Sequence, residues 1–181
     1  MAGKRTDPEY QLVARHALTA AEVKRWIAVQ RGLIALQRAH PELRDKYRAL
    51  DRDEGEAQSI EEQARALERV PEVRRELTKA GVTPRSYLVT TWAMFTSGMY
   101  AELLKQGLMK EADVPAEIPR ENFAVLQAFA KEFDEVRRET QRLEREQRAR
   151  VDEEDSDQGD EDGEPAEDEP SDSTGARRGA R

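Results

Sequence analysis

The chain has no cysteine and only two histidines among its 181 residues. The missing thiols exclude disulfide bonds, cysteine nucleophiles and cysteine-ligated zinc. His16 and His40 lie far apart in the sequence, and His40 stands directly before Pro41, where a helix is expected to end. No nucleophile elbow, zinc-protease motif, P-loop or dinucleotide fingerprint occurs. We therefore expect no enzymatic activity, no catalytic residue, no cofactor and no metal site.

Long apolar runs are missing as well. None approaches the roughly 20 residues that a membrane-spanning helix needs. The N-terminus carries Lys4 and Arg5, but the apolar segment of a secretory signal does not follow them. The sequence as given predicts a cytoplasmic protein without membrane insertion. A periplasmic or secreted protein is expected instead if the true start lies upstream.

Negative charge is concentrated at one end of the chain. The formal net charge is −8, yet the segment from Asp152 to Arg181 holds thirteen acidic residues against three arginines. The remaining residues are close to neutral, at +2. Because this segment has almost no apolar residues, it cannot bury enough surface to offset the entropy of ordering. We predict a disordered acidic tail over residues 151–181, which either binds a partner or keeps the chain soluble.

Helical periodicity dominates the rest of the chain. Alternation of apolar and polar residues, which marks half-buried strands, is absent. The tetrapeptides 19–22 and 59–62 both have the spacing of a capping box, with a hydroxyl residue three positions before a glutamate. Gly81 and Gly107 are placed to end helices, and Pro71 and Pro84 to begin them. The expected helices cover residues 19–40, 41–50, 60–68, 71–80, 84–106 and 120–150.

These elements predict an all-α fold, an antiparallel helical bundle of about four main helices with short connecting helices. An extended or partly helical arm over residues 1–17 precedes the bundle, which covers residues 18–150. The last helix is expected to project from the bundle, because its apolar stripe thins beyond Val136. The expected core consists of Trp26, Ile27, Ile34, Leu77, Leu88, Trp92, Phe95, Leu126, Phe129 and Phe133. Burial of Trp92 predicts a cost of about 3–5 kcal/mol for Trp92→Ala.

Two groups of side chains are candidates for a binding role. Aromatic and methionine residues on the 84–106 helix could line an apolar ligand pocket, although such a stripe more often packs in a core: Tyr87, Trp92, Phe95 and Met99. The last helix carries a basic surface that could contact nucleic acid phosphates: Arg138, Arg142 and Arg145. Glutamates are interspersed there, so a solvated helix face is the simpler interpretation of this stretch. A partial heptad in the same helix allows a coiled-coil homodimer, through Phe133, Val136, Thr140 and Leu143.

Several short segments resemble a family of small, uncharacterised, all-helical bacterial proteins that are often exported. The likeness covers roughly residues 7–130 and rests on Asp7-Pro8-Glu9-Tyr10, Leu18-Thr19, Val23-Lys24-Arg25-Trp26, Pro41-Glu42-Leu43, Leu67-Glu68-Arg69-Val70-Pro71-Glu72-Val73 and Ala80-Gly81-Val82-Thr83-Pro84-Arg85-Ser86-Tyr87. These motifs are helix caps and turns, so the resemblance implies a helical fold. The family has no established activity, and it therefore assigns no functional residue.

The missing catalytic motifs and the uneven charge favour a non-enzymatic protein-interaction module with an unknown protein partner. A small apolar-ligand-binding helical domain is the alternative, based on the aromatic residues of the 84–106 helix. Association with nucleic acid through the arginine-rich 137–150 stretch ranks third.

Overall fold

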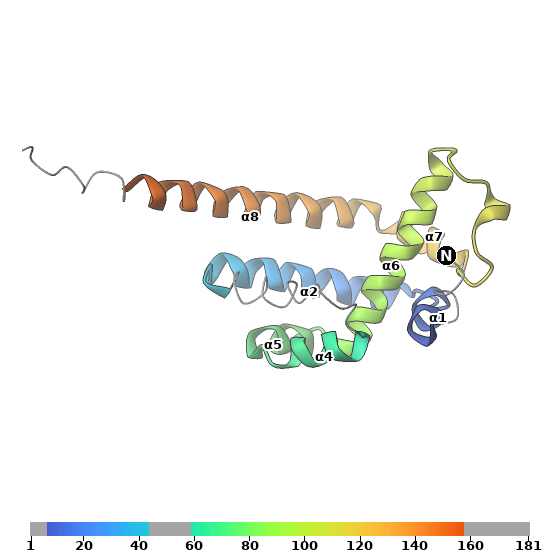
Figure 1. Ribbon diagram of the computed structural model, residues 1–181, viewed down its shortest axis with the longest axis horizontal. Helices are drawn as coiled ribbons and strands as arrows, with labels where there is room; N and C mark the ends of the chain where they lie inside the picture. The colour runs from blue at the N-terminus through green and yellow to red at the C-terminus, as the bar shows by residue number, and fades with distance from the viewer. Residues whose placement is uncertain (1–6, 44–58, 158–181) are drawn as a thin grey trace, which may run out of the picture. The chain divides into compact units, whose positions relative to one another are not determined.

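The computed structural model describes residues 7–43 and 59–157, most of which are helical and none of which lies in a strand. The predicted all-α class is confirmed for this part of the chain. The helices are α1 (Pro8–Ala14), α2 (Ala20–Ala39), α4 (Ile60–Glu68), α5 (Pro71–Lys79), α6 (Pro84–Lys105), α7 (Glu121–Ala128) and α8 (Ala130–Asp157), with a 3₁₀ turn, η2, at Glu111–Asp113 (Figure 1). Most of the helix expected over 41–50 lies outside the described residues, and so does the expected tail beyond Asp157. Residues 151–157, which are expected from the sequence to belong to the disordered tail, instead continue α8.

The chain divides into two compact units, residues 1–147 and 148–181. The first unit contains every cluster and contact described below. In the second unit, the described residues form the C-terminal turns of α8. No described helix is both long enough and apolar enough to cross a membrane.

Helix starts follow the local sequence closely. Thr19 and Glu22 form a complete capping box at the start of α2, in which the Thr19 amide donates to the Glu22 carboxylate at 2.9 Å. Ser59 and Glu62 do the same for α4. Partial burial alone would raise the pKa of the Glu22 carboxyl, but hydrogen bonds from Thr19 and the charge of His16 hold that pKa below its ordinary value. Both predicted capping boxes are confirmed.

Prolines and glycines divide the remaining helices where the sequence predicts. Pro71 and Pro84 occupy the first turns of α5 and α6. Gly81 and Gly107 have φ angles of +68° and +69°, a conformation that residues with a Cβ atom rarely adopt. Gly81 lies between α5 and α6, and Gly107 follows α6, so the two glycines separate this helix from the segments on either side.

The first core cluster joins α2 to α8. It includes Ile27 and Ile34 of α2 with Val136 and Leu143 of α8. The Trp26 ring meets the Phe133 ring edge-to-face at a centroid distance of 6.0 Å. The sequence predicts that the last helix projects from the core beyond Val136. The structure differs, because Leu143 of α8 is only 4% exposed and packs in this cluster.

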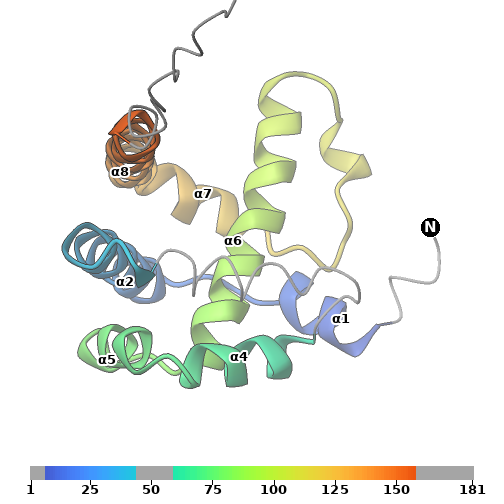
Figure 2. The same ribbon diagram turned by 60° about the vertical axis from the view of Figure 1, so that its left-hand side comes forward.

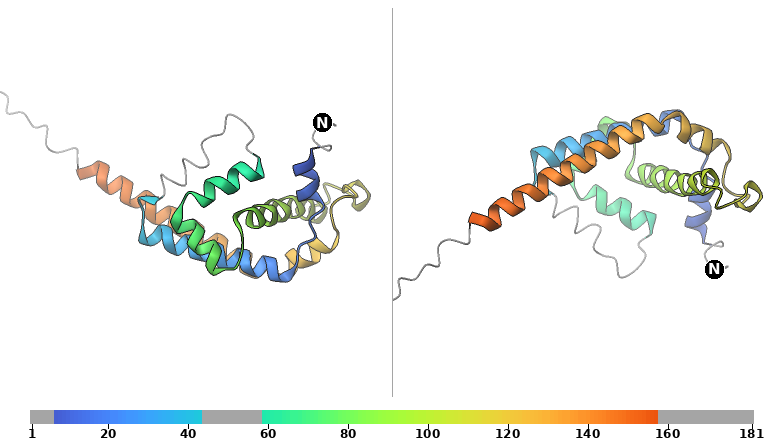
Figure 3. Two further views of the ribbon diagram at one scale, coloured as in Figure 1. Left: turned by 90° about the horizontal axis from the view of Figure 1, so that it is seen from below. Right: turned by 90° about the horizontal axis from the view of Figure 1, so that it is seen from above.

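Two ion pairs give the relative direction of α2 and α8. Arg31 pairs with Glu135 at 2.9 Å, and Arg38 pairs with Glu146 at 3.2 Å. Residue numbers rise together in both pairs, so the two helices run parallel, and α6 stands steeply across them (Figures 1 and 3). This arrangement differs from the antiparallel bundle that the sequence favours. A long crossing helix, α6, carries the chain away from the end of α5 before α7 and α8 return it.

A second cluster packs α5 against α2. Val29 joins Val70, Val73 and Leu77 in it, all of them buried. A Cβ atom at Gly32 would lie 2.5 Å from a Glu76 carboxylate oxygen. The glycine thus leaves room for the Glu76 side chain against α2.

A third cluster holds the N-terminal helix. Ala14 of α1 is buried with Val114 and Ile118 from the segment after α6, and Tyr10 and Tyr100 pack around them. The region expected to be an arm over residues 1–17 therefore contains a packed helix between Pro8 and Ala14. Figure 2 shows α1 lying beside α6.

One buried amide ties three segments together. The Asn122 side chain is 1% exposed. Its Oδ1 accepts from the Leu18 amide at 2.8 Å, and its Nδ2 donates to the His16 carbonyl and to Ser97 Oγ, each at 3.0 Å. The start of α7 is thereby fixed to the segment before α2 and to α6.

The buried face of α6 is not the one that the sequence predicts. Its buried residues are Val89, Thr90, Ala93, Met94 and Ser97. Trp92 is 41% exposed and Phe95 is 64% exposed, so both were wrongly assigned to the core. Because α6 is apolar on most of its sides, hydrophobic spacing alone could not select the packed side.

These exposures change the expected effect of substitutions on stability. Leu77→Ala should lower the free energy of unfolding by about 2–5 kcal/mol, because Leu77 is 1% exposed. Trp92→Ala should cost only roughly 1 kcal/mol. Urea denaturation followed by circular dichroism would measure both values. A larger loss for Trp92→Ala than for Leu77→Ala would show that the rings of α6 are packed after all.

Removal of the Asn122 amide should be costly for a different reason. Asn122→Ala leaves the buried Leu18 amide and the His16 carbonyl without their partner, at about 1–3 kcal/mol for each orphaned group. Ser97→Ala is the matched control, because it removes only one of the two acceptors of Asn122 Nδ2 and should cost less. Equal denaturation midpoints for Asn122→Ala and the unsubstituted chain would contradict this role.

Candidate interaction surface

An apolar stripe runs along the outer side of α6. Leu88, Trp92, Phe95 and Met99 follow one another at steps of four, three and four residues, which places them on one helix face. Phe95 is 64% exposed and Met99 is 44% exposed, while Leu88 is half-buried. We call these four residues the α6 stripe. The other sides of α6 contact α1, α2, α4, α5 and α7 (Figure 2).

The two aromatic rings of the stripe support each other. Trp92 and Phe95 meet edge-to-face, with ring centroids 6.1 Å apart and an interplanar angle of 88°. This contact restricts the conformations of both side chains. Pre-ordered aromatic rings lose less conformational entropy on binding than long aliphatic side chains do.

Charged residues bound the stripe at its two ends and are missing between them. Arg85 lies in the first turn of α6 and pairs with Glu61 of α4. Glu102, in the last turn, accepts from Gln106 at 2.7 Å and lies 3.8 Å from Lys105. From Ser86 to Ala101 there is no Asp, Glu, Lys, Arg or His. The result is an uncharged helix face with Arg85 at one end and Glu102 at the other, each beside an oppositely charged side chain.

The pocket predicted from Tyr87, Trp92, Phe95 and Met99 is not assembled. The last three lie on the stripe, but Tyr87 packs beside the second core cluster and its hydroxyl accepts from Gln30 Nε2 at 2.5 Å. Burial raises the pKa of the Tyr87 phenol above its ordinary value, and hydrogen bonds to Gln30 and Thr91 oppose the rise.

A small cleft near Tyr87 comes from other residues. It has a volume of about 100 Å³ and is lined by Glu22, Arg25, Trp26, Gly81, Val82, Ser86, Tyr87 and Thr90. Sites for small organic ligands usually measure roughly 300–1,000 Å³. The cleft is therefore too small for most such ligands.

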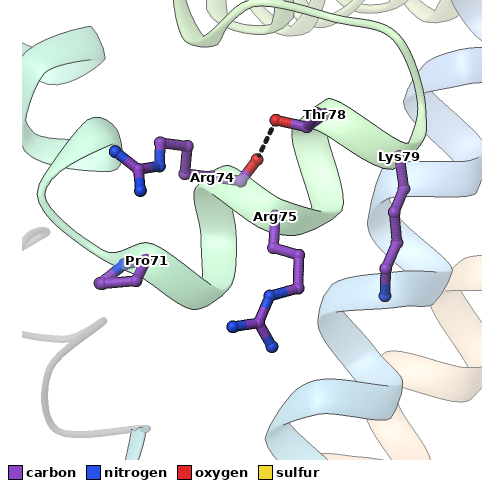
Figure 4. A pocket seen from close by; sticks show the side chains of 5 residues that line it. All are labelled: Pro71, Arg74, Arg75, Thr78 and Lys79. Atoms are coloured by element: carbon purple, nitrogen blue, oxygen red, sulfur yellow. Dashed lines mark hydrogen bonds between the residues drawn. The ribbon is translucent and has the colours of Figure 1, made fainter.

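A wider hollow lies on α5. Its volume is about 340 Å³, and Figure 4 shows its lining residues Pro71, Arg74, Arg75, Thr78 and Lys79. Thr78 Oγ1 donates to the Arg74 carbonyl at 2.8 Å, which satisfies the hydroxyl within the helix. The cationic ends of Arg74, Arg75 and Lys79 point in different directions, so they do not converge on one anion (Figure 4).

The basic surface predicted on the last helix is exposed but partly neutralised. Arg142 pairs with Glu146 at 2.9 Å, and Arg138 and Arg145 donate to backbone carbonyls of their own helix. The adjacent hollow, of about 630 Å³, is lined by Ala130, Lys131, Asp134, Arg137, Arg138 and Gln141, all from α8. This hollow is an open surface along a single helix, and the Asp134 carboxylate lies among its basic residues.

The heptad seam predicted for a homodimer faces into the first core cluster. Val136 and Leu143 are buried in that cluster, and Phe133 packs against it together with Trp26. The apolar side chains of the predicted seam are therefore already packed against other helices of the same chain. A coiled-coil dimer through α8 would require this packing to open.

Neither histidine joins a cluster of metal-ligand type. His16 Nε2 lies 3.1 Å from Glu22, and the exposed His40 Nδ1 lies 3.1 Å from Glu42. Among the described residues, no group of three or more His, Cys, Asp or Glu side chains could hold a metal ion.

The sequence pattern identified Trp92, Phe95 and Met99 as candidate binding residues but did not identify Arg85 and Glu102 at the ends of the stripe. The available signal was the long uncharged stretch between them, which spans more than four helical turns. Comparison with models of known protein families, with curated proteins and with solved structures finds no match to the chain.

Single-tryptophan variants can test the exposure of the stripe. Trp26→Phe leaves Trp92 as the only indole, and Trp92→Phe leaves Trp26, whose Nε1 donates to Thr91 Oγ1 at 2.9 Å. In dilute solution, acrylamide should quench Trp92 more strongly than Trp26, and Trp92 should emit at longer wavelength. The reverse order of quenching would contradict an exposed stripe.

Proposed function

We propose that this chain is a non-enzymatic protein-interaction module that docks a protein partner on the α6 stripe. The observation that carries the proposal is the exposure of Trp92, Phe95 and Met99 side by side on one helix face. Scattered apolar residues are normal on a protein surface, but adjacent large ones mark interaction sites. These side chains are not packed in the core, because α6 contacts the other helices through its other sides.

The composition of the stripe favours a protein over a small molecule. Aromatic residues and methionine are enriched in the centres of protein interfaces, where charged residues are depleted. The stripe is a convex helix face, whereas small ligands are held in concave pockets. Charges at its two ends give the polar rim that interfaces typically have.

The other candidate surfaces support their functions less well. An apolar ligand would have to fit a cleft of about 100 Å³ near Tyr87. Phosphate contacts by α8 would compete with the Glu146 carboxylate for Arg142. Neither surface exposes two aromatic rings in contact with each other.

Site-specific photo-cross-linking in the native host would test the docking surface. A benzophenone amino acid replaces Phe95 in the full chain, and the matched control replaces Ala28, which is exposed on α2. We expect an adduct with a protein chain from position 95, a much weaker one from position 28, and loss of the former when Trp92→Ala is added.

Three outcomes would refute the docking proposal. They are the absence of any protein adduct at position 95, equal adducts at both positions, and an adduct formed only within the same chain. The last result would mean that another segment of the chain covers the stripe.

A further inference from the structure

We infer that the partner of the α6 stripe is a second copy of this chain, docked antiparallel across a two-fold axis level with the Ala93–Met94 peptide bond. This inference rests on the proposed function, because it uses the same surface. It specifies the occupant, the direction of the two helices and their register.

The stripe is symmetric about that point. Leu88 and Met99 lie equally far from it, and so do Trp92 and Phe95. In a two-fold interface the same patch serves both copies, so residue i meets residue j and residue j meets residue i. Reversal of α6 about this point therefore places Leu88 against Met99 and Trp92 against Phe95, on both sides of the axis.

Charge selects the antiparallel direction. Arg85 and Glu102 are also equally far from the axis, and 17 residues separate them, which is about 25 Å along a helix. Antiparallel docking brings the Arg85 end of each copy to the Glu102 end of the other. Parallel docking would bring like ends together, at a cost in electrostatic repulsion.

Both charged groups can reach a second copy. The side chains of Arg85 and Glu102 are 52% and 55% exposed. Arg85 pairs with Glu61, and Glu102 pairs with Lys105 and Gln106, but these contacts are on the surface and contribute little to stability. A shallow crossing of about 20° would keep both ends of the two helices close enough to form the intermolecular pairs.

The area of the stripe predicts a weak dimer. Aromatic side chains present roughly 150–250 Å² each, so the exposed fractions of Trp92 and Phe95 amount to on the order of 200 Å² per copy. Two copies then contribute about 400 Å² of aromatic surface, whereas stable interfaces bury about 1,200–2,000 Å² in total. Leu88, Met99 and the flanking charges add to this area. We expect a dissociation constant on the order of micromolar.

A charge-exchange experiment tests the register directly in the full chain. Analytical ultracentrifugation over a concentration series should show a reversible monomer–dimer equilibrium. Arg85→Glu or Glu102→Arg alone sets like charges against each other at both ends, and each should weaken the dimer at least about tenfold. An equimolar mixture of the two variants should restore dimerisation, because each contact then joins one arginine to one glutamate. The doubly substituted chain should dimerise with itself for the same reason.

Controls separate docking from folding. Trp92→Ala should weaken the dimer by about 30-fold or more, as the loss of an interface hot spot does. Leu12→Ala removes a 37% exposed apolar side chain from α1 and should leave the dimer unchanged. Glu61→Gln removes the intramolecular partner of Arg85 and should also leave it intact. Circular dichroism confirms that every variant is folded.

The outcomes distinguish this inference from the docking function. A chain that stays monomeric at all concentrations, or a mixture that does not dimerise better than its components, overturns the two-fold pairing. A dimer that is insensitive to Trp92→Ala lies elsewhere and overturns it too. If position 95 then cross-links to a different protein, the docking function stands without the dimer. If position 95 yields no protein adduct, both fail.

Discussion

The helix α2 is buried on two of its sides, and the rest of the helical unit is arranged around that constraint. Ile27 and Ile34 share a cluster with α8, while Val29 belongs to the cluster with α5. A single helix that carries two apolar sides must be covered by two neighbours. Both neighbours come from distant parts of the chain, so α6 has to carry the backbone from one side of α2 to the other.

That crossing explains which side chains of α6 are buried. Helices that cross steeply touch over a short length, and small side chains permit close approach there. Ala93, Ser97 and Thr90 meet this requirement, and Asn122 adds a buried hydrogen bond to Ser97. Trp92 and Phe95 lie on another side of α6 and are exposed. The stripe is thus an apolar side of α6 that the core does not cover.

Local signals in the sequence predicted the ends of helices, and tertiary packing decided the rest. The capping boxes at Thr19 and Ser59 and the left-handed glycines at Gly81 and Gly107 act within four residues, so they can be identified from sequence. The parallel direction of α8 depends on core contacts between residues far apart in the sequence, such as the Trp26 and Phe133 rings. No periodicity within either helix encodes such a contact. For the same reason, the break at Phe129 between α7 and α8 was not predicted.

The packed side of α6 is separate from its exposed side. Because the core does not use the α6 stripe, the proposed docking and the folding of the chain would draw on different side chains of the same helix. A partner docked on the stripe would leave the crossing of α6 and α2 intact. The full chain carries a formal net charge of −8, so two copies repel each other in general, and the proposed contact at the stripe would have to come from local features. Those features are two rings held edge-to-face and opposite charges at the helix ends, and a contact of this small area would be reversible.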